Sequence, residues 1–379
     1  MPLAPFGPAI IWLPGTIWTG DNLAILRGVN DACVDLIYLD PPFNSNRHYE
    51  APIGSKAAGA SFKDAWTLDD VDVHEHGELA DRNPAAHAVI DAARQAHGKG
   101  MQSYMIFMAV RLLELHRVLK PTGALWLHCD PTASHYLKNL LDAVFGHGNF
   151  LNEVIWAYRT GGVSKRWFGR KHDVLLYYAA KHGKHTFHVE KERSYNRNNK
   201  PYRFKGVEEF EDDNGCWYTM AALRDVWELN AIGRSSKERT GYPTQKPLAL
   251  LERVIRASSN PGDLVLDPFC GCATTLVAAD RLQRDWVGID LSPTAVRLVH
   301  DRIGQDRGIW GGPNALDTPP RRTDLGNLPN YRTHRHRLYG VQEGICGGGT
   351  DHPENLQLLC SACNRSKGGR TMAEWRAAQ

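Results

Sequence analysis

The sequence predicts an α/β protein with a doubly wound, mostly parallel sheet, an inserted recognition region and a small C-terminal appendage. Strand-like apolar runs alternate with helical patterns over about the first 150 residues and again over residues 241–303. The run Val34–Leu39 ends at two prolines, and a second run, Leu264–Leu266, ends at a glycine-containing loop that opens a helix. Residues 151–240, between these two halves, are instead polar, basic and aromatic.

Length and composition indicate a globular protein of a reducing compartment. The 379 residues suffice for one large α/β domain with an appendage, or for two domains. No apolar run approaches the roughly 18 residues of a membrane span, and no signal-peptide pattern begins the chain. The eight cysteines are scattered, which favours free thiols over a disulfide framework. We therefore expect a cytoplasmic protein with no membrane partner.

The predicted elements follow one another along both halves. Thr16–Trp18 is a short strand, and Asp21 is a candidate N-cap of the next helix. Residues 61–100 are acidic and rich in Gly and Ala, and they predict a loop or lid followed by a helix. Lys120–Gly123 is expected to separate a helix from a strand. The other predicted helices are Tyr104–Leu119, Tyr136–Phe145, Pro247–Ser258 and Leu276–Leu282, and the other predicted strands are Val34–Leu39, Ala124–His128, Val154–Tyr158, Val174–Tyr178, Leu264–Leu266 and Trp286–Ile289.

Basic and aromatic residues gather in the insertion. From Arg159 to Lys205 there are 13 Lys and Arg residues against three Asp and Glu residues, whereas the net charge of the whole chain is only +3. Aromatic residues such as Trp167 and Phe168 are interleaved with these cations. Such a mixture is typical of a surface that follows a nucleic-acid backbone and contacts bases, and a solvated face of a helix or hairpin is the alternative.

The segment Asp40–Phe43 lies where a ligand site is expected. Prolines lack an N–H group, so the strand Val34–Leu39 cannot continue past Pro41 and Pro42. Ligands of open α/β sheets bind at the carboxyl ends of the strands. A carboxylate, a carbonyl-presenting turn and a flat ring at that edge suit a planar amino group, and an ordinary strand-ending turn is the alternative.

The segment around Gly271 predicts a nucleoside site. A strand, a glycine turn, a helix and a second strand that ends in an acid form the nucleoside-binding unit of doubly wound sheets. Gly271 allows a ligand to approach the backbone closely, and Asp290 is placed to accept from ribose hydroxyls. The G-x-G-x-x-G pattern of a pyrophosphate site is absent. We therefore expect a ligand with a ribose and no pyrophosphate, as in S-adenosylmethionine, and a structural turn is the alternative.

Together the two segments resemble the DNA amino-methyltransferases. That family has an (Asp/Asn/Ser)-Pro-Pro-(Tyr/Phe) catalytic motif and a Phe-x-Gly-x-Gly cofactor motif, matched here by Asp40–Phe43 and by the segment from Phe269. The catalytic motif comes first and the cofactor motif last, as in the β class. Gly241–Pro247 resembles the family segment at the methionine end of the cofactor, and Gly20–Leu23 resembles a further cofactor-side motif. Ala273 departs from the family, since it replaces the second glycine; if that position needs a positive φ, the Cβ costs about 1–2 kcal/mol.

The resemblance implies the S-adenosylmethionine-dependent methyltransferase fold and a site-specific DNA methyltransferase. The methyl group would pass to the N6 of a flipped-out adenine in double-stranded DNA, with Asp40 and the Pro41 carbonyl accepting from the amino group and Phe43 stacking on the base. An Asp in the first position is more typical of adenine-N6 than of cytosine-N4 enzymes, and cytosine-N4 methylation is the alternative. The implied catalytic residues are Asp40, Pro41, Pro42 and Phe43, and the implied cofactor-binding residues are Asp21, Thr244, Lys246, Asp267, Phe269, Gly271, Thr274 and Asp290.

The C-terminal region resembles a truncated HNH endonuclease. Leu338–Cys346 and Asn355–Asn364 look like the two ends of that module, with its middle missing. Three of the family's four zinc cysteines are present, and the sole Asp-His pair lies in a glycine-rich join. A zinc site would use Cys346, His352, Cys360 and Cys363. A degenerate remnant that adds basic contacts to DNA is favoured over a working nuclease.

The sequence thus predicts five regions. They are a catalytic half at 1–150, a target-recognition insertion at 151–240, a cofactor half at 241–303, a basic linker at 304–337 and an HNH-like tail at 338–379. Three other functions stay open: an HNH-type DNA endonuclease, a catalytically silent DNA-binding protein, and a methyltransferase of RNA or protein. The resemblance also implies a homodimer and a cognate restriction endonuclease as a partner.

Overall fold

The protein is described from a computed structural model. The described residues are 14–44, 47–52, 54–64, 73–159, 163–233, 235–307, 312–320 and 322–324, with the backbone of 339–341 and 356–358. The contacts divide the chain into two units, Met1–Asp324 and Leu325–Gln379. The described part of the second unit is an antiparallel pair, β15 (Tyr339–Val341) and β16 (Leu356–Leu358). Among the described residues, no helix combines the length and the apolar character needed to span a membrane.

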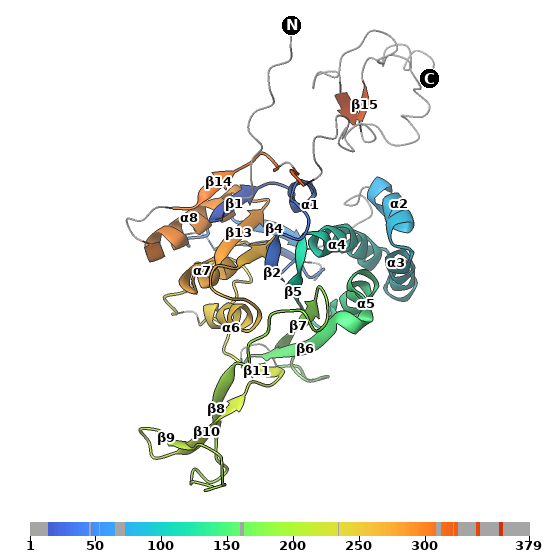
Figure 1. Cartoon of the computed structure of the whole chain (residues 1–379). Coiled ribbons are helices and arrows are strands. Elements are labelled where there is room, and N and C mark those ends of the chain that lie inside the picture. The colour runs from blue at the N-terminus through green and yellow to red at the C-terminus, as the bar shows by residue number, and fades with distance from the viewer. Residues whose placement is uncertain are drawn as a thin grey trace. The chain divides into compact units, whose positions relative to one another are not determined.

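A nine-stranded sheet organises the first unit (Figure 1). Its strands are β1 (Thr16–Thr19), β2 (Val34–Leu39), β5 (Leu119–Cys129), β6 (Phe150–Ala157), β7 (His172–Ala179), β11 (Val226–Glu228), β12 (Leu264–Asp267), β13 (Asp285–Asp290) and β14 (Asn314–Leu316). The spatial order is β11-β6-β7-β5-β2-β12-β13-β1-β14. β7 runs antiparallel to both neighbours, and the other described neighbours in this sheet pair in parallel. The predicted doubly wound, mostly parallel α/β sheet is confirmed.

Helices cover both faces of the sheet (Figure 1). One face carries α1 (Asn22–Arg27), α2 (Val73–Arg82), α3 (Pro84–His97), α4 (Lys99–Val118) and α5 (Ser134–Phe145). The short 3-10 turn η2 (His147–Asn149) follows α5. The other face carries α6 (Leu248–Ser258), α7 (Thr274–Arg281) and α8 (Pro293–Arg307). Successive strand residues point to opposite faces. Accordingly, Ile37 and Leu39 belong to the core under the first group of helices, whereas Leu36 and Tyr38 belong to the core under the second.

Two predictions for the first half need correction. The stretch 61–100 is not a loop followed by one helix, because β4 (Ser61–Asp64) pairs with β3 (Arg47–Glu50) and two helices, α2 and α3, follow. Lys120–Gly123 does not separate α4 from a strand, since β5 already begins at Leu119. The pairing of β5 with β2 jumps from Leu119 to Ala124, so the break appears as an irregularity within the ladder.

The polar middle of the chain contributes to two sheets. β6 and β7 belong to the nine-stranded sheet, because their apolar residues pack in its two cores. β8 (Lys191–Tyr195), β9 (Phe210–Glu211) and β10 (Trp217–Ala222) form a separate three-stranded sheet that projects beyond β11 (Figure 1). Likewise, part of the expected linker is structured: α8 runs to Arg307, and β14 adds an edge strand beside β1.

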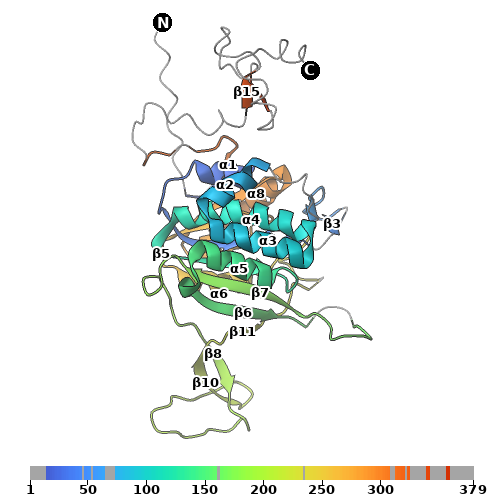
Figure 2. The same ribbon diagram turned by 90° about the vertical axis from the view of Figure 1, so that its right-hand side faces the viewer.

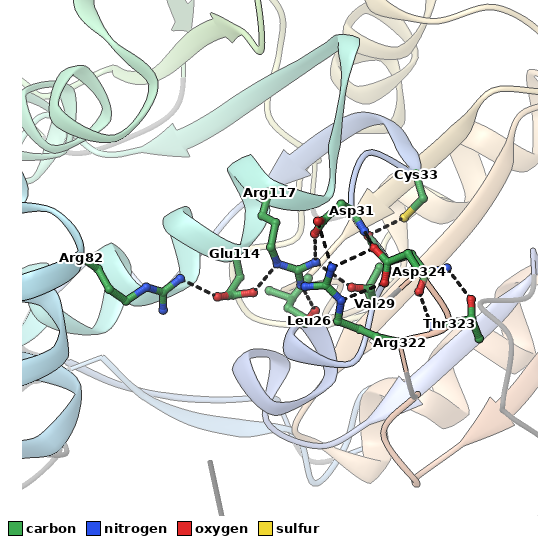
Figure 3. A network of polar contacts seen from close by, with 11 residues as sticks. Leu26, Val29, Asp31, Cys33, Arg82, Glu114, Arg117, Arg322, Thr323 and Asp324 are labelled. Carbon is green, nitrogen blue, oxygen red and sulfur yellow. Dashed lines mark hydrogen bonds and ion pairs between the residues drawn. The ribbon is translucent and has the colours of Figure 1, made fainter. Parts of the chain in front are cut away.

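An ionic network closes the amino edge of the sheet, before β2 begins (Figure 3). Glu114 of α4 accepts from Arg82 at 3.0 Å through one oxygen and from Arg117 at 2.8 Å through the other. Arg117 also donates to Asp31 and to the backbone carbonyls of Leu26 and Val29. Arg322 and Asp324 bond to Asp31 in turn, at 2.9 Å and 2.8 Å. The network therefore fastens the last residues of the first unit to α1 and α4.

Candidate active site

The loops that follow β1, β2, β12 and β13 meet at the carboxyl edge of the sheet. They line a cavity of about 900 Å³, to which the segment between β11 and α6 also contributes. All twelve site residues predicted for the first unit line this cavity: Asp21, Asp40, Pro41, Pro42, Phe43, Thr244, Lys246, Asp267, Phe269, Gly271, Thr274 and Asp290. The two halves of the chain, separated by the insertion, thus form one site.

Asp40 forms an ion pair with Lys246 through one carboxylate oxygen. Lys246 Nζ contacts Oδ2 of Asp40, and the two side chains are 8% and 18% exposed. Oδ1 of Asp40 is buried and has no hydrogen-bond partner among the described residues. A buried acceptor without a partner costs about 1–3 kcal/mol, so such an atom marks a place where a ligand donor is expected.

Phe43 is held half-buried beside this ion pair. Lys246 Nζ lies 5.0 Å from the centre of its ring, a cation–π distance. On another side the ring packs near His128 of β5, with 5.9 Å between ring centres and 30° between ring planes. These contacts orient the ring at the cavity wall.

The turn after β12 is built around Gly271 and Asp290. The Gly271 N–H donates to Oδ2 of Asp290 at 2.9 Å, and the Ser292 N–H donates to Oδ1 at 2.8 Å. Gly271 has a φ of +48°, and a Cβ there would lie 3.1 Å from the Tyr242 ring. A Cβ here would therefore press on Tyr242, and the backbone conformation also favours glycine. Ala273 has a φ of +66°, which meets the condition under which its Cβ was predicted to cost free energy.

Carboxylic acids outnumber cations in the cavity wall. Among the described residues, five Asp side chains line it, against the two cations Arg111 and Lys246. Burial raises the pKa of Asp267 to about 7, although the Thr275 side chain and the Phe269 amide donate to its carboxylate. The neighbouring charges of Asp40 and Asp290 contribute to that rise. The wall therefore suits a cationic ligand.

Asp21 joins the site to α4. It caps α1 by accepting from the Leu23 N–H at 3.2 Å, as predicted, and it accepts from Arg111 Nη2 at 2.7 Å. Arg111 Nε donates to the Asn22 side chain at 2.6 Å, and Asn22 donates to the Pro268 carbonyl at 2.8 Å. The buried Asn22 side chain thus links the first strand–helix turn to the cofactor turn, and the buried Arg111 ties both residues of the first turn to α4.

A family model described as N6/N4 methyltransferase, DNA methylase, matches residues 34–301. The chain belongs to this family. It is therefore a DNA methyltransferase of the N6-adenine/N4-cytosine family, and DNA is its substrate.

Several relatives of this DNA methylase are known. The type II methyltransferase M.HpaI of Haemophilus parainfluenzae is 26% identical over 298 residues, which cover 78% of this chain and 76% of that protein. The DNA adenine methyltransferase YhdJ of Escherichia coli K12 is 25% identical over 294 residues, covering 76% and 82%. The solved M1.HpyAVI–SAM complex matches 76% of this chain and 98% of its own, at 19% identity and a TM-score of 0.43.

The tail of the DNA methylase matches an HNH endonuclease model over residues 336–370, which confirms the predicted resemblance. The predicted zinc ligands Cys346, His352, Cys360 and Cys363 lie outside the described residues. Within the described part of the chain, no group of three or more His, Cys, Asp or Glu residues is arranged to hold a metal ion.

Sequence reasoning missed a polar chain behind Phe43. The Tyr38 hydroxyl and His128 Nδ1 lie 2.7 Å apart, and His128 Nε2 lies 3.1 Å from Asp173. The Tyr158 hydroxyl donates to the other oxygen of Asp173 at 3.1 Å. Burial raises the pKa of Asp173, but the hydrogen bond and charge of His128, the charge of Lys246 and the bond from Tyr158 together outweigh burial and leave that pKa below its usual value. The sequence signal that could have revealed this chain is His128 itself, a titratable side chain near the end of a buried strand.

Proposed function

We propose that this DNA methylase transfers a methyl group from S-adenosylmethionine to the exocyclic N6 of an adenine flipped out of double-stranded DNA. The observation that carries the proposal is the divided carboxylate of Asp40. Lys246 holds Oδ2, and the buried Oδ1 is left for a donor from outside the described residues. An amino group can donate the hydrogen bond that this oxygen does not yet accept.

Asp40 and its neighbours act by positioning. Oδ1 accepts one hydrogen of the target amino group and the Pro41 carbonyl accepts the other, which directs the nitrogen lone pair away from the base plane. Phe43 stacks on the base and lowers the cost of taking it out of the duplex. The acceleration of methyl transfer comes from orienting the amino group and from placing the Asp40 charge where positive charge develops in the transition state. No covalent enzyme intermediate is needed, and burial raises the pKa of Cys270 and Cys272, which keeps both as thiols.

The cofactor suits the turn around Gly271. S-adenosylmethionine, when bound, supplies an electrophilic sulfonium methyl group. The wall of five Asp residues against two cations favours a cationic ligand, and a cavity of about 900 Å³ has the size of ordinary cofactor sites. Asp290 is proposed to face the ribose, while Asp21, Thr244, Asp267, Phe269 and Thr274 complete the wall.

Adenine is preferred to cytosine on two grounds. An Asp in the first position of the catalytic motif is typical of adenine-N6 enzymes, and one relative is named as a DNA adenine methyltransferase. Single-molecule sequencing of DNA from cells that express the protein reads the modified base and its motif together. N6-methyladenine at a defined motif, lost with Asp40→Ala, is the expected result. If N4-methylcytosine is found at the motif instead, the target base is cytosine and not adenine. If no modified base is found, the proposed methylation is refuted.

DNA cleavage is a second candidate function, favoured by the HNH match over residues 336–370. It requires a metal ion and a water-activating histidine, for which His352 is the candidate. Purified protein is incubated with DNA and Mg²⁺, Mn²⁺ or Zn²⁺ in turn. Cutting that His352→Ala abolishes would establish the activity, and intact DNA under all three conditions would remove it.

A further inference from the structure

Residues 163–171 form a basic loop with exposed aromatic side chains. Trp167 is 65% exposed and Phe168 is 98% exposed. The Ser164 hydroxyl accepts from the backbone N–H groups of Arg166 and Trp167, at 3.2 Å and 3.3 Å. This local turn holds the segment while both rings point into solvent.

The loop is positively charged. It contains no acidic residue. Its cations Lys165, Arg166 and Arg170 form no ion pair with carboxylates of the described residues. Large apolar side chains left in water are stabilised by burial against a partner, and the surrounding cations select an anionic one. These two properties together fit DNA better than a second protein surface.

The loop leaves the sheet at the edge that holds the base site. β7 begins directly after it, and Asp173 of β7 is 3.1 Å from His128, whose ring packs near Phe43. Figure 2 shows the loop between β6 and β7 and the β3–β4 hairpin, which follows Phe43 in the chain, extending to the same side. The exposed rings therefore belong to the edge that receives the target base.

A base that leaves the duplex creates a gap between its unstacked neighbours. Apolar side chains inserted between base steps offset that unstacking. We propose that Trp167 and Phe168 enter duplex DNA at the target position and fill the gap left by the flipped base, while the loop cations hold the flanking phosphates. This inference rests on the proposed function, because the rings have this task only in an enzyme that flips its substrate base.

The test compares Trp167→Ala and Phe168→Ala with a matched control, Phe187→Ala. Phe187 is 54% exposed, and the preceding Thr186 donates its N–H to the Thr122 carbonyl, near the start of β5 and away from the base site. Two duplexes carry the motif mapped for the wild-type enzyme. One is fully paired, and in the other the target base faces an abasic site, where extrusion is easier.

We expect each loop variant to methylate the paired duplex about tenfold more slowly and to recover to within about threefold of wild type on the abasic duplex. Phe187→Ala should match wild type on both. Wild-type rates on the paired duplex, or an equal loss on both substrates, would overturn the inference. A rate loss that accompanies dissociation of a dimer in size-exclusion chromatography would also overturn it. If wild-type protein methylates neither duplex, the proposed function fails instead.

Discussion

Two clusters of charged side chains lie at opposite edges of the sheet, and they differ in whether their carboxylates are satisfied. At the amino edge, both oxygens of Glu114 accept from arginines. At the carboxyl edge, Lys246 holds one oxygen of Asp40 and the buried second oxygen has no partner among the described residues. A satisfied buried carboxylate stabilises the fold, whereas a half-satisfied one is prepared for a ligand. The two edges therefore predict opposite responses to similar substitutions.

The largest expected effect is on catalysis, at Asp40. Asp40→Asn keeps the size of the side chain and a partner for Lys246, but it replaces the charged acceptor. We expect the single-turnover methylation rate to fall by about 10³-fold, the scale seen when one transition-state partner is removed. The free energy of unfolding, measured in urea, should change by less than about 1 kcal/mol. A large loss of stability with an intact rate per folded molecule would make Asp40 structural.

The motif residues were predictable because each lies within a short segment whose local chemistry marks a strand end. Asp40–Phe43 and the turn around Gly271 carry prolines, glycine and acids in consecutive positions, and sheet topology alone brings strand ends together. The Lys246–Asp40 pair was not predictable, since 206 positions separate its members. Arg111 looked like an ordinary helical residue, and its contacts come from Asp21 and Asn22 at the start of α1.

The expected linker at 304–337 shows another limit of sequence reasoning. Its content of Pro, Gly and Arg predicted a basic linker. Composition did not indicate that Asn314–Leu316 would pair with the edge of β1 as strand β14. Backbone pairing needs no side-chain signature, so a strand this short escapes pattern analysis.

The second largest effect is on stability, at the amino edge. Glu114→Gln leaves Arg82 without its charged partner and leaves Arg117 with Asp31 alone, beside a side-chain position that is only 6% exposed. Breaking such a pair from one side costs several kcal/mol, and we expect about 3 kcal/mol here, because Arg82 reaches solvent. Denaturant unfolding measures this loss, and the methylation rate per folded molecule should stay unchanged. A slower methylation rate in the fully folded Glu114→Gln variant would mean that the amino edge also influences catalysis at the carboxyl edge.

Acidification provides an independent check on Glu114. Burial alone would raise its pKa, but hydrogen bonds and charges from Arg117 and Arg82 outweigh burial and leave the pKa below 4.5. Its stabilising contribution is therefore complete above pH 4.5 and is lost as the pH falls through the lowered pKa. Unfolding free energies measured against pH should fall more steeply for wild type than for Glu114→Gln in that range. Parallel curves would exclude Glu114 as a source of acid sensitivity.

A smaller effect separates two roles for Lys246. If Lys246 positions Asp40, Lys246→Gln should lower the methylation rate by about 30-fold, within the range for losing one charge-assisted contact, and leave the Kd for S-adenosylmethionine within about threefold. Lys246→Arg retains the charge and is the matched control, with most of the rate expected to return. A raised Kd at an unchanged rate would instead return Lys246 to the cofactor-binding role that the family resemblance implied.

The smallest effect concerns backbone strain, which the two edges share. Ala273, at the cofactor turn, has a φ of +66°, and Ala32, in the turn before β2, has a φ of +48°. Glycine relieves the Cβ clash in this region, so each Ala→Gly variant should gain about 1 kcal/mol of unfolding free energy. Ala273 is fully buried in the core and is not among the cavity-lining residues. Calorimetry should therefore find the Kd for S-adenosylmethionine within about twofold of wild type in both variants. A Kd that changes only in Ala273→Gly would mean that the strained backbone shapes the cofactor turn. Residue 273 would then affect cofactor affinity through the backbone, without lining the cavity.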